Sequence, residues 1–252
     1  MKKYIFTVLI ILSAVNIYTQ EMQLSGGTDF GLGIFSVNNN FWFNSGSDYF
    51  YCKENTTTTF FSPGFSFTIR VFPDDNTASM GFVFRDRVLF ITNEKKLGTL
   101  TIGNSHDQYS QKISETYSIL DDSFTGIMDF GLGQSIRFKI SNGLQFCADL
   151  GVNLTYMDSE DYETGSTLTY LGIGVFSNIA FQINFTSELY LELGLNTIIN
   201  ILSNQNGKIH ISEYNIITEY EDTGRWDLIS TALYIQIGWR FDLQKFRSKS
   251  LK

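Results

Sequence analysis

The amino-acid sequence predicts an all-β fold, an eight-stranded antiparallel up-and-down β-barrel that spans a membrane. Three observations lead to this prediction. Apolar and polar residues alternate with a period of two in eight segments, and the connections between these segments alternate between short turns and long polar loops. In addition, the chain opens with an apolar leader of the kind found on exported proteins.

The leader is a predicted signal peptide. Lys2 and Lys3 supply a positively charged start, and the run from Tyr4 to Val15 is apolar apart from Thr7 and Ser13. This run has the length of a signal-peptide core and is short for a membrane-spanning helix. We therefore expect residues 1–19 to be removed, which leaves one barrel domain over residues 20–252.

Each predicted strand has one apolar and one polar face. In the last strand, Ile229, Leu233 and Ile237 share a face, while Ser230 and Tyr234 lie on the other. Asp86 is an exception, because it falls on the apolar face of its segment. The predicted strands cover residues 27–37, 60–72, 78–91, 124–140, 144–156, 169–185, 189–201 and 229–243.

The connections between the strands are of two kinds. Tight-turn compositions occur at 73–76 (PDDN), 141–143 (SNG) and 186–188 (TSE). Long polar loops are predicted at 38–59, 92–123, 157–168 and 203–225. An even number of antiparallel strands with short periplasmic turns and long extracellular loops is typical of an outer-membrane barrel.

A soluble barrel or sandwich is the alternative, because it also produces alternation. Two features favour a membrane. The polar faces are rich in Gly, Ser and Asn, which suits a narrow wet lumen, and aromatic residues gather at the strand ends, where they would form interfacial girdles. The predicted girdle residues are Phe41, Trp42, Phe43, Phe60, Phe61, Tyr156, Trp226, Trp239 and Phe241.

Eleven charged residues fall on the polar faces and are expected to point into the lumen. Buried charges need partners, so an interior ion-pair network that plugs the barrel is the main interpretation, and a selective ion path is the alternative. Eight strands leave an interior that side chains nearly fill. The residues are Asp29, Arg70, Arg85, Arg87, Asp129, Arg137, Lys139, Asp149, Glu192, Arg240 and Asp242.

The pentapeptide DFGLG occurs twice, at 29–33 and 129–133. A kinase-type metal loop and a nucleotide-binding glycine loop are both excluded, because the companion motifs that each requires are absent. In a barrel strand the Phe and Leu of each copy face lipid and the glycines face the lumen, where they relieve crowding. We expect Asp29 and Asp129 to meet lumenal arginines.

Composition excludes several kinds of ligand. The net charge is −8 and becomes −10 when Lys2 and Lys3 leave with the leader, which argues against nucleic acid as a partner. The acidic stretch 158–163 lacks the spacing of a calcium loop and is expected to be solvated.

Cys52 and Cys147 should lie on opposite rims, too far apart for a disulfide. No metal or cofactor is predicted.

The segment LYIQIGWRFDLQKF, residues 233–246, resembles the aromatic-ended last strand of the small eight-stranded outer-membrane barrels, although RSKSLK follows Phe246. The mature chain as a whole is similar in architecture to this group, which includes the OmpA transmembrane domain, OmpX and OmpW. Its Asn-, Tyr- and Phe-rich composition also resembles spirochaete outer-membrane barrels. The resemblance implies an outer-membrane location, contact with lipids, insertion by the barrel-assembly machinery and a monomeric state.

Three functions follow from this resemblance. The first is a surface-exposed structural or interaction protein, adhesin-like, whose loops engage an extracellular ligand or host surface. The second is an OmpW-like narrow channel for small or hydrophobic molecules. The third is remote: His210 and Ser212 resemble the His/Ser pair of lipid A deacylase barrels, with Glu219 or Glu221 available to orient the imidazole. Such a short coincidence is common in polar loops, so no enzymatic activity is expected.

Overall fold

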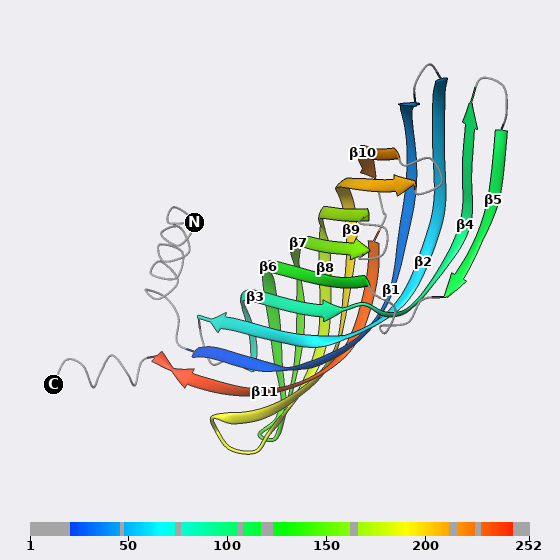
Figure 1. The fold of residues 1–252 in the computed structure, drawn as a ribbon. Helices are drawn as coiled ribbons and strands as arrows, with labels where there is room; N and C mark the ends of the chain where they lie inside the picture. Colours follow the sequence, from blue (N-terminus) through cyan, green and yellow to red (C-terminus); the bar gives the residue numbers. More distant parts are fainter. Residues whose placement is uncertain are drawn as a thin grey trace.

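The computed structural model describes residues 21–45, 48–73, 77–104, 108–116, 123–161, 166–211, 216–224 and 228–243. Within these residues the chain forms eleven antiparallel β-strands in one sheet (Figure 1). None of the described segments is a helix long and apolar enough to cross a membrane.

Eight of the strands close into a ring, which confirms the predicted eight-stranded barrel. The first strand pairs with both the second and the last strand, so the wall has no free edge. In ring order the strands are β1 (Glu21–Ser45), β2 (Asp48–Phe72), β3 (Ala78–Phe90), β6 (Ser123–Ser141), β7 (Leu144–Asp161), β8 (Ser166–Asn184), β9 (Leu189–Ile211) and β11 (Leu228–Asp242).

The strands are staggered around the ring. A line of directly paired residues that leaves β1 at Ile34 returns to β1 at Leu24, ten residues nearer the start of the strand. This stagger tilts the strands against the barrel axis. The line passes through Ile34, Ile229, Ile199, Val175, Val152, Leu132, Phe84, Ile69 and Leu24.

The outer face of the wall is apolar and the inner face is polar. On β11, Leu233 and Ile237 are 65% and 62% exposed, whereas the alternating Tyr234 and Gln236 are buried. The other barrel strands repeat this pattern, so the exposed apolar surface runs around the whole wall. A surface of this extent needs an apolar environment, which lipid supplies.

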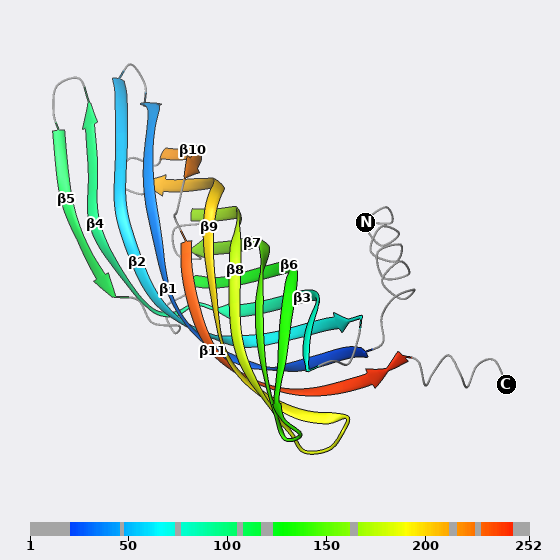
Figure 2. The same ribbon diagram turned by 180° about the vertical axis from the view of Figure 1, so that it is seen from behind.

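The predicted long loops are largely β-structure, and this corrects the expectation for 38–59, 92–123, 157–168 and 203–225. β1 and β2 continue past the barrel as a hairpin, and β4 (Thr92–Asn104) and β5 (Gln108–Thr116) add a second hairpin beside it. Figures 1 and 2 show both hairpins rising past the other strands. We call this four-stranded sheet, in the order β1-β2-β4-β5, the extracellular extension.

The same correction applies at the other long connections. β7 and β8 extend to Asp161 and Ser166, and β10 (Ile216–Gly224) pairs with the far end of β9. Most residues of these segments are polar, so the period-two signal by which strands are predicted is weak there.

β2 changes its partner near Pro63. Gly64 and the residues after it pair with β3, whereas Phe61, Thr59 and the residues before Thr59 pair with β4. Proline has no backbone N–H, so it fits where one ladder ends and another begins. Asn93, the second residue of β4, has φ of 50°, in the left-handed region that asparagine tolerates, close to where the chain leaves β3.

The two short connections that the structure describes in full, at 141–143 and 186–188, lie together at the opposite rim, as predicted. Ser141 Oγ accepts a hydrogen bond from the Gly143 amide at 3.3 Å, and Thr186 Oγ1 accepts one from the Leu189 amide at 2.9 Å. The described ends of the barrel chain meet at this rim, where Glu21 pairs with Asp242. This is the periplasmic rim of the barrel.

Candidate functional site

The extracellular mouth of the lumen is closed by an apolar layer, which we call the apolar cap. Seven of the eight barrel strands each contribute one side chain, and none of these is more than 5% exposed. The rings of Phe35 and Tyr170 meet edge to face at 5.3 Å. The members are Phe35, Phe60, Leu89, Ile127, Met157, Tyr170 and Leu228.

The apolar cap was not predicted, because polar faces were expected to line the whole lumen. Phe60 was placed in the outer girdle, but its side chain is 3% exposed and belongs to the cap. Each of the seven strands contributes one residue to the cap, which is too few for a periodic signal, and apolar residues such as Val83 and Phe176 also point inward deeper in the lumen.

Below the apolar cap, the two DFGLG aspartates meet arginines of β3. Arg87 donates to Asp129 Oδ2 through Nε at 3.0 Å and Nη2 at 2.7 Å. Arg85 Nη2 lies 3.5 Å from Asp29 Oδ2, and Asp29 also accepts a short hydrogen bond from Ser66. These charge-assisted contacts pair each buried arginine with a carboxylate, although Arg85 Nε and Nη1 and Arg87 Nη1 have no hydrogen-bond acceptor.

The centre of the lumen is occupied by Arg70. Its guanidinium donates to Asp149 through Nε and Nη2 and to Glu192 through Nη1 and Nη2, with the shortest distance to each carboxylate at 2.7 Å. All three side chains have no exposed surface. Tyr234 and Gln182 donate to Glu192, and Asn178 donates to Asp149. Each oxygen of the two carboxylates therefore accepts at least one hydrogen bond, which a buried ion pair requires.

Near the periplasmic rim, Glu21 is the carboxylate that joins two arginines. It accepts a short hydrogen bond from Arg137 Nη1, and Arg240 Nε lies 3.9 Å away. Sequence reasoning missed Glu21, because the first strand was expected to begin at residue 27. Gly26 and Gly27 interrupt the alternation of apolar and polar residues, so the sequence pattern did not predict that the strand continues to Glu21.

Two of the eleven predicted lumenal charges lie at the rim. Lys139 is half-buried beside the turn at 141–143, and Asp242 is exposed at the end of β11, outside the lumen.

Among the described residues, five arginines and five carboxylates form the ion pairs of the interior, so their charges cancel. They are Arg70, Arg85, Arg87, Arg137 and Arg240, with Glu21, Asp29, Asp129, Asp149 and Glu192.

Inward glycines make room for aromatic rings that support two of these arginines. Tyr234 lies against Gly194 of the neighbouring strand, and the Arg85 guanidinium stacks over its ring, 4.3 Å from the ring centroid. Tyr190 lies against Gly238 in the same way, and Arg240 sits over its ring at 4.5 Å. A Cβ at either glycine would collide with the ring, so these positions need glycine for space.

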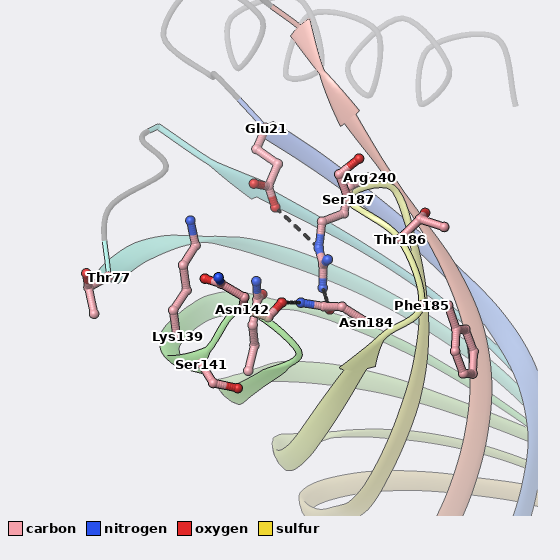
Figure 3. A pocket seen from close by; sticks show the side chains of 11 residues that line it. Glu21, Thr77, Lys139, Ser141, Asn142, Asn184, Phe185, Thr186, Ser187 and Arg240 are labelled. Atoms are coloured by element: carbon pink, nitrogen blue, oxygen red, sulfur yellow. Dashed lines mark hydrogen bonds and ion pairs between the residues drawn. The ribbon is translucent and has the colours of Figure 1, made fainter.

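The periplasmic mouth holds an open depression of about 590 Å³, which we call the periplasmic pocket (Figure 3). Its walls come from the start of β1, the end of β11 and the two turns that join β6 to β7 and β8 to β9. The lining residues are Glu21, Thr77, Lys139, Ser141, Asn142, Gln145, Asn184, Phe185, Thr186, Ser187 and Arg240.

The predicted girdle residues differ in exposure and in their position along the barrel wall. Trp239 is 49% exposed near the periplasmic rim, and Tyr156 is 37% exposed near the other end of the wall. Phe61 and Phe241 are half-buried. Trp226 lies outside the described residues.

Trp42 departs from the predicted girdle. It pairs with Tyr51 in the extracellular extension, seven residues past Phe35, the last β1 residue that pairs with β11. At about 3.3 Å per residue this position is roughly 20 Å along the strand beyond the barrel rim. Phe41 and Phe43 lie in the same hairpin.

The remote catalytic candidates lie at the far end of β9 and in β10. His210 pairs with Ile217, whereas Glu219 pairs with Lys208 and Glu221 with Asn206. Ser212 and His106 lie outside the described residues. Over the described ranges, no group of three His, Cys, Asp or Glu side chains is arranged to hold a metal ion.

The two cysteines lie in separate parts of the molecule. Cys147 is fully buried in β7 and forms no disulfide. Cys52 pairs with Phe41 and Ile102 in the extracellular extension, while Cys147 pairs with Arg137 near the periplasmic rim.

Comparison with known proteins supports this architecture through structure alone. No protein-family model matches the chain, and no curated protein matches it in sequence. The solved structure of the outer membrane protein OprG from Pseudomonas aeruginosa superposes with a TM-score of 0.51 at 10% identity, covering 89% of this chain and 97% of OprG. The chain has the fold of a small outer-membrane β-barrel.

Two further structures are similar at lower scores. Neisserial surface protein A matches with a TM-score of 0.44 and 10% identity over 87% of this chain and 97% of its own. Ail, the attachment invasion locus protein of Yersinia pestis, matches with a TM-score of 0.44 and 8% identity over 88% of this chain and 99% of its own.

Proposed function

We propose that the protein is an outer-membrane barrel that presents its extracellular extension to a partner outside the cell, as a surface-exposed interaction protein. The observation that supports this proposal most directly is the combination of a plugged lumen with a β-sheet that continues past the barrel wall. The proposal includes lipid contact around the wall, insertion by the barrel-assembly machinery and a monomeric state.

The extracellular extension has the features of a recognition surface. Four strands continue there as one sheet, and in the described residues β5 pairs only with β4. An edge strand offers backbone N–H and C=O groups that can pair with an extended segment of another protein. Lys95 and Lys96 lie on β4, the strand next to that edge.

The lumen offers less support for transport. The apolar cap closes the extracellular mouth, and the ion-paired Arg70 fills the centre with no exposed surface. An OmpW-like channel would need a path through both layers or through the wall. The pairing of the eight barrel strands is continuous at the level of the line from Ile34 to Leu24, so the wall is closed there.

The enzyme hypothesis receives no support from the described residues. Glu219 is paired with Lys208, two residues along the ladder from the pair that His210 forms with Ile217.

The test is adhesion of cells that display the protein. Replacing residues 94–115 by a short Gly-Asn turn removes β4 and β5 but leaves all eight barrel strands in place. We expect the displayed wild-type protein to increase adhesion to epithelial monolayers and immobilised extracellular matrix. The shortened variant should reduce adhesion to the level of cells without the protein.

The matched control keeps residues 94–115 in length and composition but scrambles their order. Both variants must show the heat-dependent gel mobility of a folded barrel and surface accessibility to protease. Adhesion that is equal for wild type and the shortened variant contradicts the proposed function.

A further inference from the structure

The periplasmic pocket contains a buried donor that lacks an acceptor. Arg240 is 8% exposed, and its Nη2 donates to Gln182 at 2.8 Å and to Asn184 at 2.7 Å. Its Nε has no hydrogen-bond acceptor, since the nearest carboxylate oxygen, on Glu21, is 3.9 Å away. Figure 3 shows the guanidinium reaching into the pocket between Glu21 and Asn184.

The pocket also contains a buried acceptor that lacks a donor. Gln145 is 5% exposed, and its Oε1 has no hydrogen-bond partner. It lines the same depression as Arg240. An unpaired buried polar atom is costly, and two of opposite kind in one pocket indicate a ligand that both accepts and donates.

The charge of the lining favours an anion. The lining contains two positively charged residues, Lys139 and Arg240, and one carboxylate, Glu21. Glu21 already accepts from Arg137 and from Gln23, which is 2.7 Å away, so its charge is largely committed to partners beneath the pocket. A carboxylate suits the Nε–H of Arg240, because this donor has no hydrogen-bond acceptor while both Nη2 donors are already used.

We propose that the periplasmic pocket binds a small anion in which a carboxylate lies beside an N–H or O–H donor, as at the carboxyl end of a short peptide. The carboxylate accepts from Arg240 Nε and from Lys139, and the neighbouring donor reaches Gln145 Oε1. A pocket of about 590 Å³ is within the range of small-molecule sites. This site is on the opposite side of the membrane from the extracellular extension.

The test is titration calorimetry of the full barrel in detergent micelles with three probes: alanylalanine, its methyl ester and inorganic phosphate. We expect alanylalanine to bind and its methyl ester to bind about tenfold or more weakly, because the ester cannot form the charge-assisted hydrogen bond. Phosphate should bind more weakly than alanylalanine, since it has no carboxylate with an N–H donor on the neighbouring residue.

Three variants assign the site. Lys139→Gln and Arg240→Gln should each weaken alanylalanine binding by about tenfold, and Gln145→Leu should weaken it by a smaller factor. Lys95→Gln is the matched control, because Lys95 is an exposed lysine on β4 at the other end of the molecule. It should leave binding unchanged. If Arg240→Gln does not fold, Lys139→Gln still tests the proposal, since Lys139 lies at the rim.

Several results would overturn the proposal. They are no binding of any probe, equal binding of the peptide and its ester, phosphate binding as tight as peptide binding, or wild-type affinity in both charge variants. None of these results bears on adhesion through the extracellular extension, so the two proposals can fail separately.

Discussion

Asp86 is a carboxylate on the apolar outer face of the barrel wall. It pairs in register with Phe67 of β2 and Phe130 of β6, and its Oδ1 has no hydrogen-bond partner. The carboxylates of the lumen differ in this respect, since Asp149 is bonded to Arg70 and Asn178. Two aspartates of the same chain therefore occupy opposite environments, and their stability effects should have opposite signs.

Replacement of Asp86 by leucine should stabilise the barrel. An ionisable group on the lipid face is unfavourable, and its removal should raise the free energy of unfolding by about 1–2 kcal/mol. Asp149→Leu is the matched control and should lower it by about 3 kcal/mol, because Arg70 then loses a buried partner. Equilibrium urea unfolding in lipid vesicles measures both values. A loss of stability in Asp86→Leu would show that Asp86 is not lipid-facing in the folded barrel.

At the scale of elements, neighbouring strands fit together through pairs of glycine and aromatic residues. Gly194 of β9 pairs with Tyr234 of β11, and Gly238 of β11 pairs with Tyr190 of β9. The same two strands thus exchange one ring each across a single ladder. The rings in turn support Arg85 and Arg240, so strand pairing and the ion-pair layers depend on each other.

Substitution of Gly194 should disturb this fit. In Gly194→Ala the added Cβ would collide with the Tyr234 ring, and we expect a loss of about 1–3 kcal/mol in the free energy of unfolding from overpacking. Gly143→Ala provides the control, because nothing lies within 4 Å of a Cβ at that turn position, and it should change stability by less than about 0.5 kcal/mol. Equal effects of the two substitutions in urea unfolding would contradict the packing role of Gly194.

At the scale of the whole molecule, the closed ring separates a lipid-facing wall from a filled interior. The interior has the apolar cap at the extracellular mouth, paired arginines in the middle and the periplasmic pocket at the other mouth. The periplasmic pocket is open, but the layers above it have side chains with little or no exposed surface. The molecule is therefore open on one side only.

This arrangement predicts that the folded protein does not conduct ions. In planar lipid bilayers we expect no single-channel steps from the wild-type barrel, because charged side chains fill the centre of the lumen and pair with one another. A larger porin in the same bilayers is the positive control. Regular steps from the purified, folded protein would favour the channel function over the surface-interaction function.

The alternation of residues was enough to predict the eight barrel strands, their faces and the two kinds of rim. Alternation is a local property, since each strand has its lipid-facing and lumen-facing residues two positions apart in the chain. The inward positions of Asp29 and Asp129 follow from the same rule. The alternation rule did not predict the strands of the extracellular extension, because segments such as Thr56–Thr59 are polar on both faces.

The sequence by itself therefore determined which residues face lipid and which face the lumen. Only the tertiary structure decided that Arg70 meets both Asp149 and Glu192, that Glu21 joins Arg137 and Arg240, and that seven strands close the apolar cap. These contacts join residues far apart in the chain, and they depend on the pairing registers and on the ten-residue stagger around the ring. Register and stagger are relations between paired strands around the closed barrel, so the sequence of a single strand does not specify them.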